Sequence, residues 1–305
     1  MLHFFLIIVS LLVIMKMAEV FINQSASFAK KFNLSGFFVG FLLVSFGTCL
    51  PELTTSIYSV TLGHQEIAIS SVIGSYISNI FLVLGFLALL RKYKLKKRDT
   101  NFNIPLLLLI TFGSLLLLVA NVFVTSVFVG VLFVCIFLIA AFIVNKNNHS
   151  EKQFKIVKLN YFFLVGSLAL IILFSRICID SILKVTTQLN LPEVLIGYFI
   201  LALGTSLPEF ITLLTSLKMG REDIGLGNLV GSNMFNILFI PGILSFIAPL
   251  DFAPFQLELV FVFFAAVLLF IFGLIGKKYF ISRREGFVLL LLYLVFILIQ
   301  VFRNL

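Results

Sequence analysis

The chain has 305 residues, of which 61% are hydrophobic and only 11% are charged, and its formal net charge is +9. This composition is too apolar for a soluble domain, and the apolar runs are long enough to cross a hydrocarbon core of roughly 30 Å. The runs are continuous, which excludes a membrane β-barrel with its alternating strands. The positive charge lies in short loops between them, which argues against a nucleic-acid-binding surface. We predict an all-α polytopic membrane protein.

Ten membrane-spanning helices are predicted, and the second and seventh are interrupted by a proline, at Pro51 and Pro208. Proline lacks a backbone N–H and breaks a helix, and lipid cannot satisfy the carbonyl groups that the break frees. We therefore expect both breaks to face protein or a polar cavity. The predicted spans are 2–23, 35–62, 66–90, 103–120, 122–144, 160–183, 193–217, 222–249, 255–275 and 285–302.

Basic residues mark one side of the membrane. Most of the 22 Lys and Arg residues lie in the loops that follow odd-numbered spans, and the densest group occupies 91–98. The positive-inside rule makes these loops cytoplasmic, so both termini are expected outside.

The motif around the first break occurs twice. Residues 47–52 read Gly-Thr-Cys-Leu-Pro-Glu, and residues 204–209, 157 positions later, read Gly-Thr-Ser-Leu-Pro-Glu. Shared hydrophobicity does not explain matching glycine, proline, glutamate and asparagine residues. At the same offset, Gly74-Ser75 matches Gly231-Ser232, and Asn79 matches Asn236.

Each half of the chain holds five predicted spans. Because five is odd, the second half enters the membrane from the opposite side. Interrupted helices at matching places of two such halves indicate a binding site near the membrane midplane. We predict inverted repeats at 1–145 and 159–305, joined by a cytoplasmic linker at 146–158.

Polar side chains at helical spacing surround these breaks. Thr48 and Glu52 share one face of a helix, as do Thr205 and Glu209. A carboxylate at membrane depth is costly and points to function. Oxygen ligands without His suit Ca²⁺, and carbonyls at helix breaks coordinate Na⁺. Competition for shared carboxylates predicts antiport.

Other interpretations of the same residues remain open. The two glutamates could be protonated structural plugs, the carboxylates could line a cation channel, or the protein could be a membrane scaffold that transports nothing. Sealed sites at the midplane of inverted repeats favour alternating access over a pore.

The duplicated motifs, on five-plus-five spans, resemble the sodium/calcium exchangers of the calcium/cation antiporter superfamily, in a prokaryotic form without a regulatory domain. The resemblance implies Na⁺/Ca²⁺ exchange by a non-enzymatic antiporter, with spans 1 and 6 sliding against the others. It also implies a protein without cofactors that works as a monomer in the lipid bilayer of a prokaryotic plasma (inner) membrane.

The resemblance further implies a set of ion ligands. Glu52 and Glu209 are the central Ca²⁺ ligands. The remaining expected ligands are Thr48, Thr205, Ser206, Ser75, Ser232, Asn79, Asn236 and the backbone carbonyls around Ser45 and Ala202. Cys49 stands where the family usually has Ser, so a thiol replaces one hard Na⁺ ligand.

Two more departures bear on coupling. Tyr76 replaces the usual Asn of the Gly-Ser-Asn motif, which adds bulk beside the expected site. Asn236 stands where potassium-dependent relatives have Asp, which argues against K⁺ coupling. The alternative function is H⁺/Ca²⁺ exchange at the same site. Leu53 and Phe210 after the two acids differ from the proton-coupled pattern, so Na⁺ is favoured.

Overall fold

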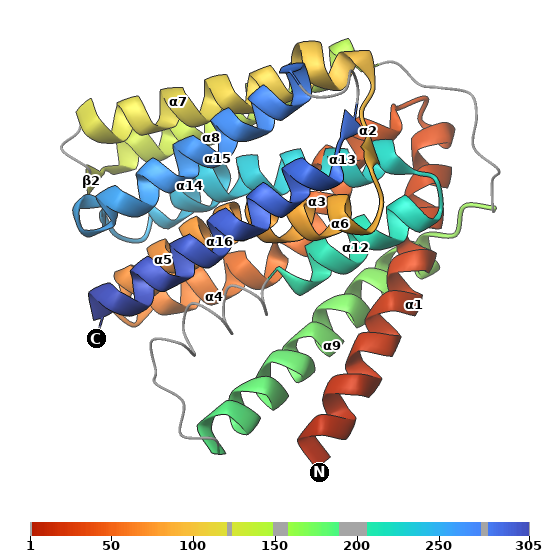
Figure 1. The fold of residues 1–305 in the computed structure, drawn as a ribbon, viewed down its shortest axis with the longest axis horizontal. Helices are drawn as coiled ribbons and strands as arrows, with labels where there is room; N and C mark the ends of the chain where they lie inside the picture. The colour runs from red at the N-terminus through yellow and green to blue at the C-terminus, as the bar shows by residue number, and fades with distance from the viewer. Residues whose placement is uncertain (1, 121–123, 149–157, 189–205, 276–279, 305) are drawn as a thin grey trace. The chain divides into compact units, whose positions relative to one another are not determined.

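Figure 1 shows a computed structural model of the chain, which describes residues 2–120, 124–148, 158–188, 206–275 and 280–304. The described residues are mostly helical, with short π-helical turns inside several helices. The first half contains α1 (Leu2–Lys31), α2 (Gly36–Val39), η1 (Gly40–Val44), α3 (Ser45–Thr48), α4 (Leu50–Thr61), α5 (Gln65–Ser78), η2 (Asn79–Leu84), α6 (Gly85–Leu90), β1 (Tyr93–Lys94), η3 (Asp99–Asn103), α7 (Ile104–Ala120), β2 (Val124–Thr125) and α8 (Val127–Asn147).

The second half repeats this helical character. Its elements are α9 (Tyr161–Gln188), α12 (Leu207–Lys218), α13 (Glu222–Met234), η5 (Phe235–Phe239), α14 (Ile240–Leu244), β3 (Leu250–Asp251), η6 (Ala253–Phe255), α15 (Gln256–Ile275), β4 (Phe280–Ile281) and α16 (Arg283–Asn304). The strands form two short antiparallel ribbons, in which β1 pairs with β4 and β2 pairs with β3.

Several helices are suited to a membrane. Among the described residues, seven are long and apolar enough to cross it, or up to eight if the bent pair Gly36–Thr48 and Leu50–Thr61 counts as one span. These match eight of the predicted spans. The sixth corresponds to α9, and the seventh is described only from α12 onward because 189–205 lies outside the described residues. The total of ten therefore stays a prediction.

The predicted break in the second span is confirmed. The helix stops at Thr48 and resumes at Leu50, with a bend of 45° between the two parts. Cys49 lies at this break, where its N–H donates to the carbonyl of Ser45 at 2.9 Å. At the corresponding position in the second half, α12 begins at Leu207, with Pro208 in its first turn. Proline is tolerated there because the first N–H groups of a helix have no partner within it.

Two π-helical turns fall at matching positions of the sequence repeat. Asn79 begins η2, and Asn236, its counterpart, lies in η5. A π-helical turn widens the backbone locally and is frequent at functional sites. Hydrophobic periodicity alone did not predict these turns.

The first helix is longer than predicted. The polar residues after position 22 indicated an end at 23, but α1 continues to Lys31. Those polar side chains have partners in the protein: Gln24 Oε1 accepts from the N–H of Asn160 at 2.8 Å, and Asn23 Oδ1 accepts from Arg221 Nη2 at 3.1 Å. The eighth span is shorter than predicted, because its helix ends at Leu244 and the chain then joins the β2–β3 ribbon.

By its contacts the chain forms two compact units. Unit 1 comprises 1–51, 148–229 and 294–305, and unit 2 comprises 52–147 and 230–293. Each unit draws on both halves of the sequence. A grouping by contacts is a different property from a sequence repeat, so the predicted boundaries at 145 and 159 stay a prediction.

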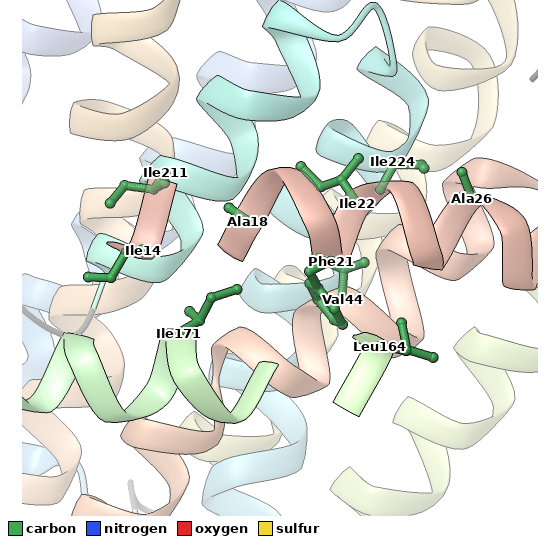
Figure 2. Packing of buried hydrophobic residues seen from close by; sticks show 10 residues of the cluster. All are labelled: Ile14, Ala18, Phe21, Ile22, Ala26, Val44, Leu164, Ile171, Ile211 and Ile224. Carbon is green, nitrogen blue, oxygen red and sulfur yellow. The ribbon is translucent and has the colours of Figure 1, made fainter. Parts of the chain in front are cut away.

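The core of unit 1 forms around α1 and α9, which lie side by side (Figure 1). Apolar side chains from α1, η1, α9, α12 and α13 meet there, as Figure 2 shows. They are Ile14, Ala18, Phe21, Ile22, Ala26, Val44, Leu164, Ile171, Ile211 and Ile224. In lipid, such packing contributes through close fit of the side chains, because lipid tails are as apolar as the core.

Two glycines allow helices of unit 1 to touch backbone to backbone. A Cβ atom on Gly40 would lie 2.1 Å from the carbonyl oxygen of Ile224. A Cβ atom on Gly227 would lie 2.1 Å from the carbonyl oxygen of Phe37. These reciprocal contacts join η1 and α2 to α13, as small residues do in membrane helix pairs.

Unit 2 is built in the same way. Its helix α7 packs along α15, and α8 packs against α14. Gly286 lies against the backbone of Gly85, since a Cβ atom on Gly286 would be 2.7 Å from that carbonyl oxygen. In the β2–β3 ribbon, Thr125 Oγ1 accepts hydrogen bonds from Ser245 Oγ at 2.8 Å and from the N–H of Leu250 at 3.1 Å.

We expect Gly40→Ala to destabilise the protein by about 1–3 kcal/mol or more, because its methyl group would overlap a backbone carbonyl that cannot rotate away. Thermal unfolding in detergent micelles measures the effect. Gly166→Ala in α9 is the matched control, because nothing lies within 4 Å of its Cβ position. Equal melting temperatures for the two variants would contradict the close contact.

Candidate cation site

A chain of buried polar side chains surrounds the helix break in unit 1. Cys49 Sγ–H donates to Glu209 Oε1 at 3.4 Å, and Thr48 Oγ1 donates to Asn228 Oδ1 at 3.2 Å. The Thr48 side chain also hydrogen-bonds to Glu209. All four side chains are at most 2% exposed. The break thus brings together a carboxylate, an amide, a hydroxyl and a thiol.

The helix ends explain why these groups meet. Cys49 occupies the residue between α3 and α4, and Glu209 lies in the first turn of α12. A helix N-terminus favours a negative charge because its unpaired N–H groups point outward. The same pattern recurs in unit 2, where Glu52 lies in the first turn of α4 and is 1% exposed.

Two backbone carbonyl groups near the break belong to Ser45 and Gly47. The Ser45 carbonyl, an expected ligand, accepts from the Cys49 N–H and from Thr48 Oγ1 at 3.3 Å. Gly47 precedes Pro51 by four residues, so Pro51 cannot give its carbonyl the usual helical hydrogen bond. The proline therefore removes one donor from the turn that carries the motif.

Unit 2 holds the polar residues of the other two predicted helices. Ser75 and Asn79 lie on α5 and at the start of η2, and Ser232 and Asn236 lie on α13 and η5. All four are buried, and α5 packs against η5. The π-helical turns thus position both asparagines inside unit 2.

Several buried oxygen atoms have no hydrogen-bond partner among the described residues. They include one carboxylate oxygen, two amide oxygens and two hydroxyl oxygens: Glu209 Oε2, Asn79 Oδ1, Asn236 Oδ1, Ser232 Oγ and Thr212 Oγ1. Burying such a group without a partner costs roughly 1–3 kcal/mol. Glu209 and Thr212 belong to unit 1, and Asn79, Ser232 and Asn236 belong to unit 2.

The predicted ligands divide between the two units. Unit 1 contains Ser45, Thr48, Cys49, Ser206 and Glu209, and the structure brings Thr48, Cys49 and Glu209 together. Ser206 precedes α12 as its cap residue. Unit 2 contains Glu52, Ser75, Asn79, Ser232 and Asn236.

Two predicted ligands, Ala202 and Thr205, lie outside the described residues. The joint use of Glu52 and Glu209 by one ion stays a prediction.

Asn228 is a contact that the family pattern did not supply. It precedes Ser232 by one helical turn on α13, and it accepts the hydrogen bond from Thr48. Polar residues at intervals of four in an apolar helix are the signal that finds it. In the part of the chain that the structure describes, no three His, Cys, Asp or Glu residues group as in a metal centre.

Tyr76, the bulky replacement in the motif, has a buried hydroxyl that is hydrogen-bonded to Thr111. Its hydroxyl lies 2.7 Å from Thr111 Oγ1, and it is 1% exposed. Thr111 Oγ1 itself donates to the carbonyl of Leu107 at 2.8 Å, so Tyr76 is the donor to Thr111. The hydrogen bond of the Tyr76 hydroxyl thus links α5 to α7 within unit 2.

Comparison with known proteins places the chain in a family. The sodium/calcium exchanger protein family matches residues 2–145 and 159–302. The putative antiporter CaxA of Alkalimonas amylolytica is 29% identical, over 94% of this chain and 95% of that protein. The sodium/calcium exchanger MaX1 of Methanosarcina acetivorans is 28% identical, over 97% and 98%.

A solved structure agrees with these relatives. The sodium-calcium exchanger NCX_Mj, soaked with 2.5 mM Na⁺ and 0.1 mM Ca²⁺, is 27% identical and superposes with a TM-score of 0.83 over 97% of each chain. This fold defines a polytopic helical membrane protein. The chain belongs to the sodium/calcium exchanger protein family.

We expect Tyr76→Phe to lower stability by about 1 kcal/mol, the net worth of one buried hydrogen bond, and to leave ion exchange unchanged. Thermal unfolding and ion uptake into liposomes measure the two effects. Tyr58→Phe is the control, since Tyr58 is 67% exposed. An altered ion dependence in Tyr76→Phe at unchanged stability would show that this hydroxyl belongs to the ion path.

Proposed function

We propose that this protein is a secondary active antiporter that exchanges Na⁺ for Ca²⁺ at a midplane site containing Glu52 and Glu209. The observation that carries the proposal is the orphaned, buried Glu209 Oε2 beside a helix break, in a chain of this family. The other orphaned oxygens would add neutral ligands. Ca²⁺ takes six to eight oxygens, and two carboxylates balance its charge.

Exchange follows from competition for the same oxygens. Carboxylates buried in an apolar protein are costly without compensating charge, so a site that has released Ca²⁺ must take up other cations. Na⁺ binds to carbonyls at interrupted helices and to hydroxyl oxygens. One ion species therefore leaves before the other occupies the site, which couples the two gradients.

The proposal includes the architecture expected from the sequence. Ten spans in two inverted repeats would place the second and seventh spans in opposite orientations around one site. The cytoplasmic loops would be the basic ones, with both termini outside. The pair α1 and α9, which pack along each other, would slide together to open the site to either side.

In proteoliposomes loaded with Na⁺, we expect uptake of ⁴⁵Ca²⁺ that depends on the outward Na⁺ gradient. Glu52→Gln and Glu209→Gln should each reduce apparent Ca²⁺ affinity by at least about 100-fold, because loss of one buried charge partner costs about 3–5 kcal/mol. Glu66→Gln removes the same charge at an exposed position of α5 and should retain uptake.

The same assay distinguishes the alternatives. Uptake driven by a pH gradient and indifferent to Na⁺ would replace Na⁺ by H⁺ as the coupling ion. Large unitary currents in planar bilayers would indicate a channel. Unchanged flux in both glutamate variants would remove the two carboxylates from the site.

Cys49 offers a further test of the Na⁺ sites. A thiol is a poor ligand for Na⁺, so Cys49→Ser should lower the Na⁺ concentration at half-maximal exchange, by about tenfold for each 1.4 kcal/mol of affinity gained. Cys135→Ser on α8, an exposed position, is the control. Superimposable Na⁺ curves for Cys49→Ser and the parent protein would exclude Cys49 from Na⁺ binding.

A further inference from the structure

The thiol of Cys49 gives the cluster in unit 1 a chemistry that hydroxyl and carboxylate oxygens lack. Its Sγ lies 3.4 Å from Glu209 Oε1, and both side chains are 2% exposed. The other carboxylate oxygen, Glu209 Oε2, has no hydrogen-bond partner among the described residues. The Cys49 sulfur, a soft ligand atom, and Glu209 Oε2, a hard ligand atom without a hydrogen-bond partner among the described residues, therefore belong to the same buried cluster.

We propose that Cys49 and Glu209 bind a thiophilic divalent cation of the zinc and cadmium class, and that this cation blocks the exchange cycle. The binding depends only on the cluster. The block rests on the proposed exchange function, because Glu209 is one of the carboxylates that Ca²⁺ and Na⁺ would share.

The geometry suits such an ion. Bond lengths of about 2.3 Å for Zn–S and about 2.1 Å for Zn–O put the two ligand atoms about 3.5 Å apart at a tetrahedral angle. The observed separation of 3.4 Å needs almost no rearrangement. Thr48, whose side chain hydrogen-bonds to Glu209, and Asn228, whose Oδ1 accepts from Thr48 Oγ1, lie beside this pair of ligand atoms.

The ligand chemistry explains both selectivity and block. Thiolate ligands select thiophilic metals, whereas Ca²⁺ prefers oxygen alone. When the metal binds, the thiol proton that Glu209 now accepts is released to water, and a metal–sulfur bond replaces the hydrogen bond. Such a bond slows release of the ion, so the carboxylate stays occupied and neither transported ion can use it.

Metal binding can be measured without transport. In the purified variant Cys135→Ser/Cys178→Ser, Cys49 is the remaining cysteine. Titration with Cd²⁺ should produce an ultraviolet sulfur-to-cadmium charge-transfer band that saturates at one ion per chain. Adding Cys49→Ser should abolish the band. A persisting band, or none in the parent variant, would overturn the proposal.

If the triple variant fails to fold, alkylation of Cys49 in the double variant decides the question. Cd²⁺ should slow the reaction of Cys49 with maleimide, and Ca²⁺ at the same concentration should slow it much less. Equal protection by both ions would contradict a thiophilic site.

Transport tests the block. Cd²⁺ should inhibit Na⁺-driven ⁴⁵Ca²⁺ uptake, and Cys49→Ser should require at least about tenfold more Cd²⁺, because a hard hydroxyl replaces the soft ligand. Cys135→Ser should match the parent protein. Equal sensitivity of Cys49→Ser and the parent would overturn the block, while the exchange itself would stand. A cadmium band without any Na⁺-driven uptake would instead refute the proposed function and retain the metal site.

Discussion

The backbone contact between η1 and α13 is the constraint on which the unit 1 cluster depends. Gly40 and Gly227 lack the Cβ atoms that would keep the two helices apart. The close approach brings Asn228, one residue beyond Gly227, to Thr48 at the end of α3. In a membrane, where apolar side chains gain little by leaving lipid for protein, such a fit holds helices together. The polar cluster is thus positioned by residues that carry no polar side chain.

Helix breaks leave backbone groups of this scaffold without their usual helical partners. An uninterrupted helix satisfies its own carbonyls, but Pro51 cannot bond to the carbonyl of Gly47. The bend at Cys49 also puts Thr48 and the first turn of α4 on separate helical pieces. A carboxylate at each resumed helix, Glu52 in one unit and Glu209 in the other, recurs as the sequence repeat requires.

The sequence was sufficient for features that depend on composition and on side-chain identity. Long apolar runs located the spans that the described residues confirm, up to eight of the ten predicted, and Pro51 located the break to within two residues. The sequence was insufficient for features that depend on backbone geometry or on contacts with residues distant in the chain. The spacing of the hydrophobic residues does not predict the π-helical turns at Asn79 and Asn236. The polar residues of α1 beyond 22 find partners far away in the chain, because Asn160 donates to Gln24 and Arg221 donates to Asn23.

Cys49 shows how a single departure from a repeat changes the character of a site. Its counterpart in the second half is Ser206, whose side chain carries a hard oxygen and which immediately precedes α12. Cys49 instead directs a weak donor at Glu209 Oε1 and leaves Oε2 without a partner among the described residues. In a fully satisfied polar network, the carboxylate would be held rigidly by its hydrogen bonds and would gain little from a further partner. A thiol hydrogen bond is weaker than one from a hydroxyl, so Cys49 holds the Glu209 carboxylate less firmly than a serine at the same position would.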